Sequence, residues 1–485
     1  MRALGIALLV LAGARTAAAA SFAIAVGYNG SSRQEVAPLA YADDDAVRNA
    51  ELLGELGVPT TLLTALDGDT RALYPDLAPR APTLSELRSA LATTTAQLAQ
   101  ARAAGEPTAL LFFYTGHGDV EHGEGFLELL DARLTRTELR SLLRTVPVDQ
   151  VHLIIDACKS YFAVFDRGGS SRRAVADPFL RPEEPLPANV GVLLSTSSSQ
   201  DSHEWEAFQG GIFSHEVRSA LRGGADLDGD GAISYEEVGA FVFTANRSIP
   251  NARFRPDFFV RPPGGKPAST LLVQVGAVGP ASELSVGPGV SEHLYIEDER
   301  GLRMADVHPS PDLTVHIVLP ERRPLFVHAL GSAQEYAIAE PGNVTLASLT
   351  ARPPESRSRG ALHVAFSHLF AEPFDASAPA AFDAAMLVRA EEARLAALPP
   401  PMGRWLRPTL GVAGLVFAAA GAGASGLAFY ERAQVSPSSS NRSRLAHNAA
   451  IARYNQLAVP LYGLAATTLV SYVLWRYVGE DDRGP

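Results

Sequence analysis

Two apolar runs, each followed directly by a residue able to do chemistry, decide the fold of this chain. "LLFFYTGHGD" (Leu110–Asp119) places a histidine between two glycines, and "QVHLIIDAC" (Gln150–Cys158) ends in the only cysteine of 485 residues. Short apolar runs bounded by turn residues predict strands buried on both faces. "SFAIAVGYN" and "NVGVLLSTS" have the same character, and stretches with helical spacing lie between the runs. Residues 21–262 are therefore predicted to form an α/β domain, with a mostly parallel sheet flanked by helices.

The ends of the two quoted strands are the first candidate site. Ligands and catalytic groups gather at the carboxyl ends of parallel strands, where His117 and Cys158 both lie. If the strands are neighbours, the imidazole can take the thiol proton and the thiolate can attack a carbonyl. Gly118 leaves its N–H free to approach a substrate, and with the N–H of Cys158 it would form an oxyanion hole.

Other interpretations of these residues stay open. Taken singly, a cysteine at a strand end is usually a packed core residue, and a histidine in a glycine-rich loop is often a turn residue. A metal site built from His117 and His122 has less support, because the chain has one cysteine and no histidines at helical spacing.

From about Ser21 to Val260 the sequence resembles the caspase and metacaspase family of cysteine peptidases. Four segments carry the resemblance: "YADDDA", "YTGHGD", "DAC" and "SSSQDSHEWEAFQGGIFSHEVRSAL". The resemblance implies a caspase-type sheet and hydrolysis of protein or peptide substrates. It also implies that His117 is the general base and Cys158 the nucleophile, with no cofactor required for the chemistry.

The same resemblance implies a specificity pocket. Metacaspases cleave after Arg or Lys, and their pocket residues correspond here to Asp45, Thr115 and Asp156. Two carboxylates at the base of a pocket would favour a guanidinium and repel an acidic P1 side chain. The neighbouring acids Asp43 and Asp44 are expected to cap a helix instead.

Departures from the family pattern support an alternative function. The family commonly continues past the cysteine with His-Ser-Gly, whereas this chain reads Lys159, Ser160 and Tyr161. A lysine beside the thiol can lower the thiol pKa or simply point to solvent. The alternative is therefore a catalytically weak or inactive scaffold that binds partners at a membrane surface. Arg172 and Arg173 lie in a long turn-rich segment, which is either a self-cleavage site or an uncut surface loop.

"DLDGDGAISYEE" (Asp226–Glu237) matches the template of a calcium-binding loop, with Gly231 at the sharp turn. Its predicted oxygen ligands are Asp226, Asp228, Asp230, the Ala232 carbonyl, Ser234 and Glu237. We expect Ca²⁺ to bind here in a structural or activating role, while the plain alternative is a solvated acidic turn.

The two ends of the chain predict export and a membrane anchor. Residues 1–20 have the layout of a cleavable signal peptide. In residues 401–485, Pro408–Tyr430 and Leu457–Trp475 are each long and apolar enough to cross a bilayer, which predicts a transmembrane hairpin. The connecting loop holds more arginines than acids, so we expect it inside and the soluble domains on the extracytoplasmic, periplasmic side.

Between the α/β domain and the hairpin, composition predicts two further segments. Short alternating runs over residues 263–350 predict a small β-sandwich domain, and residues 351–400 predict a linker followed by a helical segment. The formal charge of −12 argues against a nucleic-acid partner, because phosphate binding requires clustered Lys and Arg.

Overall fold

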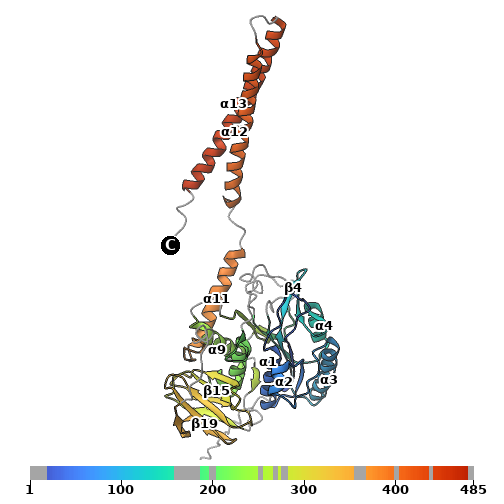
Figure 1. The fold of residues 1–485 in the computed structure, drawn as a ribbon, viewed down its shortest axis with the longest axis vertical. Helices are drawn as coiled ribbons and strands as arrows, with labels where there is room; N and C mark the ends of the chain where they lie inside the picture. Colours follow the sequence, from blue (N-terminus) through green and yellow to red (C-terminus); the bar gives the residue numbers. More distant parts are fainter. Residues whose placement is uncertain are drawn as a thin grey trace, which may run out of the picture. The chain divides into compact units, whose positions relative to one another are not determined.

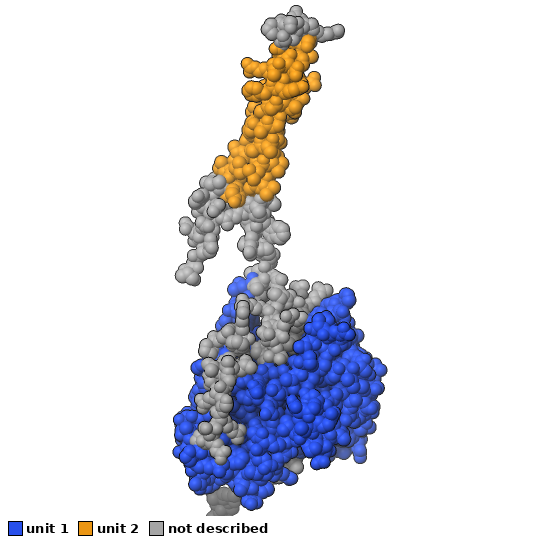
Figure 2. Space-filling view, viewed as in Figure 1, with its two compact units in different colours: residues 1–396 blue, residues 397–485 orange. Residues whose placement is uncertain are grey.

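The computed structural model describes nine stretches of the chain. They are residues 19–157, 186–195, 204–249, 255–265, 271–274, 282–353, 368–397, 403–435 and 441–478. The chain divides into two compact units, Met1–Ala396 and Ala397–Pro485, which are described separately (Figure 2). The predicted signal peptide up to residue 18, Cys158, Lys159 and the Arg172–Arg173 pair all lie outside the described residues.

The first unit is built on a six-stranded sheet, with the order β12-β8-β7-β3-β1-β2 (Figure 1). The four predicted strands are β1 (Ala20–Tyr28), β3 (Thr108–Gly116), β7 (Gln150–Asp156) and β8 (Val190–Ser195). All four are parallel neighbours, which confirms the predicted mostly parallel sheet. Two edge strands complete it: β2 (Thr60–Thr64) is parallel to β1, and β12 (Phe258–Arg261) is antiparallel to β8.

Helices cover both faces of this sheet because successive strand residues point to opposite sides. α3 (Leu84–Ala103) and α4 (Arg136–Arg144) share one core with Ile24, Phe112 and Ile155. The opposite face packs against α1 (Ala42–Glu55), α8 (Ile212–Ser219) and α9 (Tyr235–Arg247), and a short α2 (Gly68–Leu73) follows β2. α1, α3 and α4 confirm the helices expected from the stretches of helical spacing between the apolar runs, which cover residues 43–57, 83–105 and 135–146.

The N-terminus of α1 differs from the prediction. Asp43 and Asp44 do not cap the helix, because their carboxylates accept hydrogen bonds from two loops and from α2. Asp43 accepts hydrogen bonds from Asn29 Nδ2 at 2.7 Å and from the Asp67 N–H at 2.8 Å. Asp44 accepts one from the Thr70 hydroxyl at 2.9 Å. These buried acids tie the start of α1 to the loop after β1 and to α2.

Two small antiparallel sheets accompany the central sheet. β4 (Gly118–Glu121), β5 (Glu124–Glu128) and β6 (Arg133–Thr135) form a three-stranded antiparallel sheet directly after β3. β9 (Glu204–Trp205) and β10 (Gly210–Gly211) form a two-stranded ribbon that leads directly into α8.

Residues 282–352 form two sheets. The smaller contains β14 (Glu283–Val286), β17 (Val315–Val318) and β20 (Asn343–Thr345). The larger is antiparallel and contains β15 (Leu294–Asp298), β16 (Arg303–Val307), β18 (Leu325–Ala329), β19 (Gln334–Ile338) and β21 (Ala351–Arg352). Apolar side chains of both sheets share one core with α8, α9 and the π-helical turn Ala220–Gly224. Residues 282–352 thus pack onto the α/β layer within the same unit.

α11 (Ala378–Ala397) ends the first unit, and its Phe382 stacks on Phe258 of β12. The second unit is a pair of long helices, α12 (Gly403–Ala433) and α13 (Asn441–Val478). Glycines allow close packing, since a Cβ on Gly414 would lie 2.7 Å from Leu469. Among the described residues, one helical segment, Leu410–Ala433, is long and apolar enough to cross a membrane. The second predicted span, Leu457–Trp475, lies within α13, and its crossing of a membrane stays a prediction.

Candidate active site

His117 lies directly after β3, where the chain turns into β4. Gly116 precedes it with φ of +156°, and a Cβ there would lie 2.6 Å from the Tyr114 hydroxyl, so the turn requires glycine. The ring Nε2 lies 3.1 Å from the Ala37 carbonyl oxygen. Because a carbonyl only accepts, the neutral ring carries its proton on Nε2 and leaves Nδ1 as the basic atom. Partial burial lowers the pKa of His117, which favours this neutral, proton-accepting form at pH 7.

The strand that leads to the cysteine lies beside β3 in matched register. Thr115 of β3 is paired with Asp156 of β7, so the two strands end at the same edge of the sheet. Cys158 follows Ala157 in the sequence and lies outside the described residues, so the predicted dyad and oxyanion hole stay predictions. Gly118, the predicted oxyanion-hole partner, is the first residue of β4 and pairs with Leu127 of β5.

The two predicted pocket carboxylates, Asp45 and Asp156, converge on β10. The Gly211 N–H donates to Asp45 Oδ2 at 2.7 Å. A Cβ on Gly211 would lie 2.6 Å from Asp156 Oδ2 and 3.1 Å from Asp45 Oδ2, so a larger residue would displace both acids. Asp156 is bonded by the N–H and hydroxyl of Ser214, at 3.1 and 2.7 Å. Burial raises the pKa of Asp156, and the negative charge of Asp45 raises it further.

Two features of this site were not predicted from the sequence. Arg218 of α8 pairs with Asp45, its Nη1 lying 2.8 Å from Asp45 Oδ1, so the charge of Asp45 is already offset inside the protein. The Thr115 hydroxyl donates to the Ala42 carbonyl oxygen at 2.7 Å and therefore supports the start of α1. The two consecutive glycines before α8 were a usable sequence signal that the backbone passes close to other groups there. An arginine within a helix, by contrast, does not reveal a partner that lies far away in the sequence.

A buried ion cluster holds α8 against the larger sheet of residues 282–352. Asp306 of β16 accepts hydrogen bonds from His215 Nε2 at 2.7 Å and from His293 Nε2 at 2.5 Å. Arg303 Nε adds a third bond at 2.6 Å, and the Ser219 hydroxyl accepts from the Asp306 N–H at 3.0 Å. The Arg303 guanidinium and the hydrogen bonds from His215 and His293 hold the pKa of Asp306 well below its usual range, despite full burial. The cluster fixes the helix that also carries Ser214 and Arg218.

The predicted calcium loop brings some of its ligands together. Carboxylate oxygens of Asp226, Asp228 and Glu237 lie within 4.8 Å of one another. Gly231 adopts φ of +78°, as the sharp turn requires. Asp230 instead accepts from the Ala232 N–H at 2.7 Å, and the Ser234 hydroxyl bonds Glu237 at 2.8 Å. Burial raises the pKa values of Asp226 and Glu237. The donor set fits a hard divalent cation.

Comparisons with solved structures place this chain beside insect caspases. The crystal structure of caspase-1 from Spodoptera frugiperda aligns with 15% identity and a TM-score of 0.34, covering 53% of this chain and 92% of that one. The structure of pro-sf-caspase-1 aligns with 13% identity and a TM-score of 0.31, covering 50% and 86%. No curated protein matches the chain. The family model described as the caspase domain matches residues 21–244. Those residues carry a caspase domain, consistent with a cysteine peptidase.

Proposed function

We propose that this protein is a cysteine endopeptidase of the caspase type, with His117 and Cys158 as its catalytic pair. The observation that carries the proposal is the matched ending of β3 and β7, which lead to these two residues from one edge of the sheet. The caspase-domain match over residues 21–244 supports the same chemistry.

The proposed reaction begins with transfer of the Cys158 thiol proton to Nδ1 of His117. The thiolate attacks the scissile carbonyl carbon, and the N–H groups of Gly118 and Cys158 stabilise the oxyanion. The tetrahedral intermediate collapses when His117 returns the proton to the leaving amine. Water, activated by the same imidazole, then hydrolyses the thioester and restores the free thiol.

The proposal extends to cleavage after Arg or Lys. The convergence of Asp156 and Asp45 around Gly211 supports this specificity, because two carboxylates in one place attract a cation and repel an acidic side chain. Arg218 offsets the charge of Asp45, so Asp156 would carry most of the discrimination. A P1 guanidinium would also favour ionisation of Asp156, whose pKa is raised in the free protein.

Peptide hydrolysis by the purified full chain tests the proposal. Matched peptides with Arg, Lys or Asp at P1 should be cleaved in the first two cases only. Asp156→Asn should lower kcat/KM for the Arg peptide by about 30-fold or more, because losing a partly buried charge partner typically costs ~2–5 kcal/mol. Cleavage after Asp, or an Arg rate unchanged by Asp156→Asn, would reject the specificity. No cleavage of any peptide would favour the alternative of an inactive scaffold.

We also propose that the chain is anchored in a membrane and that its soluble domains are exported. Leu410–Ala433 supports an anchor, because it is long enough to cross ~30 Å of hydrocarbon. The calcium site is likewise proposed as a structural support, since Glu237 both belongs to the carboxylate group and caps α9.

A further inference from the structure

A cavity of about 190 Å³ lies between the caspase-type layer and the sheets of residues 282–352. α1, Tyr74 directly after α2, α8 and the turn Ala220–Gly224 contribute one wall. The β15–β16 hairpin and the loop after β17 contribute the other. The volume lies below the ~300–1,000 Å³ typical of pockets for drug-sized ligands, so an occupant must be small.

The lining is unusually rich in arginine. Its guanidinium groups come from both walls: Arg48, Arg218, Arg222, Arg300, Arg303 and Arg322. Four acids also line it: Glu51, Glu55, Asp298 and Glu321. The formal lining charge is therefore 6 − 4 = +2. Further acids outside the lining pair with some of the arginines, so formal charge alone does not identify the ligand.

Lining donors that have no hydrogen-bond partner identify the ligand better than the formal charge does. In the described part of the chain, the buried lining atoms that have no hydrogen-bond partner are all guanidinium nitrogens. They are Nε and Nη2 of Arg48, Nη2 of Arg218 and Nε of Arg222, and these residues are only 7%, 2% and 3% exposed. Of these atoms, Arg48 Nη2 lies 3.6 Å from Asp44 Oδ1, which is an ion pair beyond hydrogen-bond distance. A guanidinium has five donors, and one carboxylate cannot accept them all. Leaving charged donors unmet in a buried site is costly.

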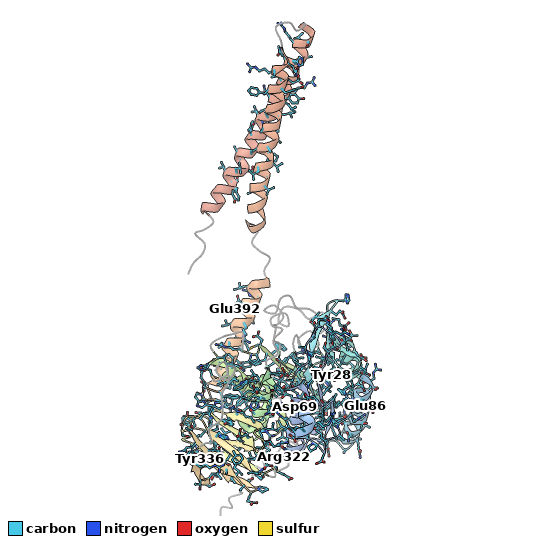
Figure 3. The ribbon with its side chains drawn as sticks, viewed as in Figure 1. Tyr28, Asp69, Glu86, Arg322, Tyr336 and Glu392 are labelled. Atoms are coloured by element: carbon cyan, nitrogen blue, oxygen red, sulfur yellow. The ribbon has the colours of Figure 1, made fainter. Side chains whose placement is uncertain are left out.

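Three of the four lining acids are paired by contrast, and the fourth, Glu321, is exposed. Glu55 pairs with Arg222, and Asp298 accepts from Arg300 Nε at 2.8 Å. Arg322, labelled in Figure 3, lies at the more exposed side, with Nη2 3.5 Å from Glu51 Oε1. Burial raises the pKa of Glu51, and the negative charge of Glu55 raises it further. The buried groups left to bind a ligand are thus cationic donors from several directions.

We propose that this cavity binds a small phosphate-bearing anion, either inorganic phosphate or a phosphate monoester. A tetrahedral oxyanion accepts hydrogen bonds from several directions at once, which suits donors that come from α1, α8 and the loop after β17. The site is distinct from the proposed peptidase centre and its binding does not depend on peptidase activity. Arg218 nevertheless connects the two, because it lines the cavity and pairs with Asp45.

Titration calorimetry on the purified full chain tests this proposal, with inorganic phosphate, pyrophosphate and glycerol phosphate as separate probes at constant ionic strength. At least one probe should bind saturably with one site per chain. Arg322→Gln should weaken binding about 10-fold or more, the loss expected for one charge-assisted hydrogen bond. Arg222→Gln should weaken it at least as much, with circular dichroism to confirm folding.

Arg102→Gln is the matched control, because Arg102 is an exposed arginine of α3 far from the lining residues, and it should leave binding unchanged. Phosphate also stabilises proteins non-specifically by exclusion from their surfaces, an effect that all variants would share. Absence of saturable binding for every probe would overturn the proposal. So would equal affinity in the wild type, Arg322→Gln and a folded Arg222→Gln. The relative affinities of the probes distinguish free phosphate from a monoester.

Discussion

Replacing Asp306 with asparagine removes the central charge of the cluster that holds α8 against β16. The wild-type carboxylate accepts from two histidines and from Arg303, and its side chain is completely buried. An amide keeps the shape but offers one acceptor atom, and its NH₂ group would face donors. Arg303 would also be left as a largely buried cation without its carboxylate.

The expected cost follows from that geometry. Removing one partner of a buried ion pair typically costs ~3–5 kcal/mol. With roughly 2 °C of Tm per kcal/mol, the lower end for domains of ~150–250 residues, Asp306→Asn should lower Tm by about 6–10 °C. Differential scanning calorimetry of the full chain measures this shift, and Asp312→Asn is the matched control because Asp312 is exposed. A Tm loss no larger than that of Asp312→Asn would refute the view that Asp306 braces α8.

Three further predictions concern calcium, pH and the membrane. Millimolar Ca²⁺ should raise Tm in the wild type and not in Glu237→Gln; an equal rise in both would reject the site. Burial lowers the pKa of His152 to about 4, so the folded state binds fewer protons than the unfolded state between about pH 6.5 and 4. Stability should therefore fall as pH falls through this window, by up to ~1.4 kcal/mol per unit from this residue, and His152→Gln should flatten the urea-unfolding profile against pH. The chain should remain in the pellet after carbonate washing of membranes, and its release would argue against an anchor through Leu410–Ala433.

The central sheet was predictable because its strands are apolar on both faces. Ile24 and Val26 pack on one side while Ala23 and Ala25 pack on the other, so the run lacks polar alternation and contrasts with the amphipathic helices around it. β2, "TTLLT", was missed because it lies at a sheet edge, where half-buried threonines interrupt the apolar pattern. β12 was missed because it is short and antiparallel to its only neighbour.

The positions of the candidate site residues were predictable only where two neighbouring strands carry them. Thr115 and Asp156 occupy adjacent strands in matched register, so motif position alone placed them together. The roles of Arg218 and Asp306 depend on contacts between segments far apart in the sequence, which no local pattern encodes. Asp43 and Asp44 were predicted as helix caps for the same reason, since their partners lie in a loop and in α2, which meet α1 only in the folded chain.

Covalent labelling of the single cysteine tests the proposed peptidase most directly. A peptidyl acyloxymethyl ketone ending in Arg should alkylate Cys158 stoichiometrically in the wild type, as read by intact mass and peptide mapping. His117→Ala should label at least 100-fold more slowly if His117 activates the thiol, since general-base catalysis contributes ~10²–10⁴-fold. The Asp-ended analogue should label poorly. No labelling of Cys158 by the Arg reagent, or the same labelling rate in His117→Ala, would contradict a His117–Cys158 peptidase.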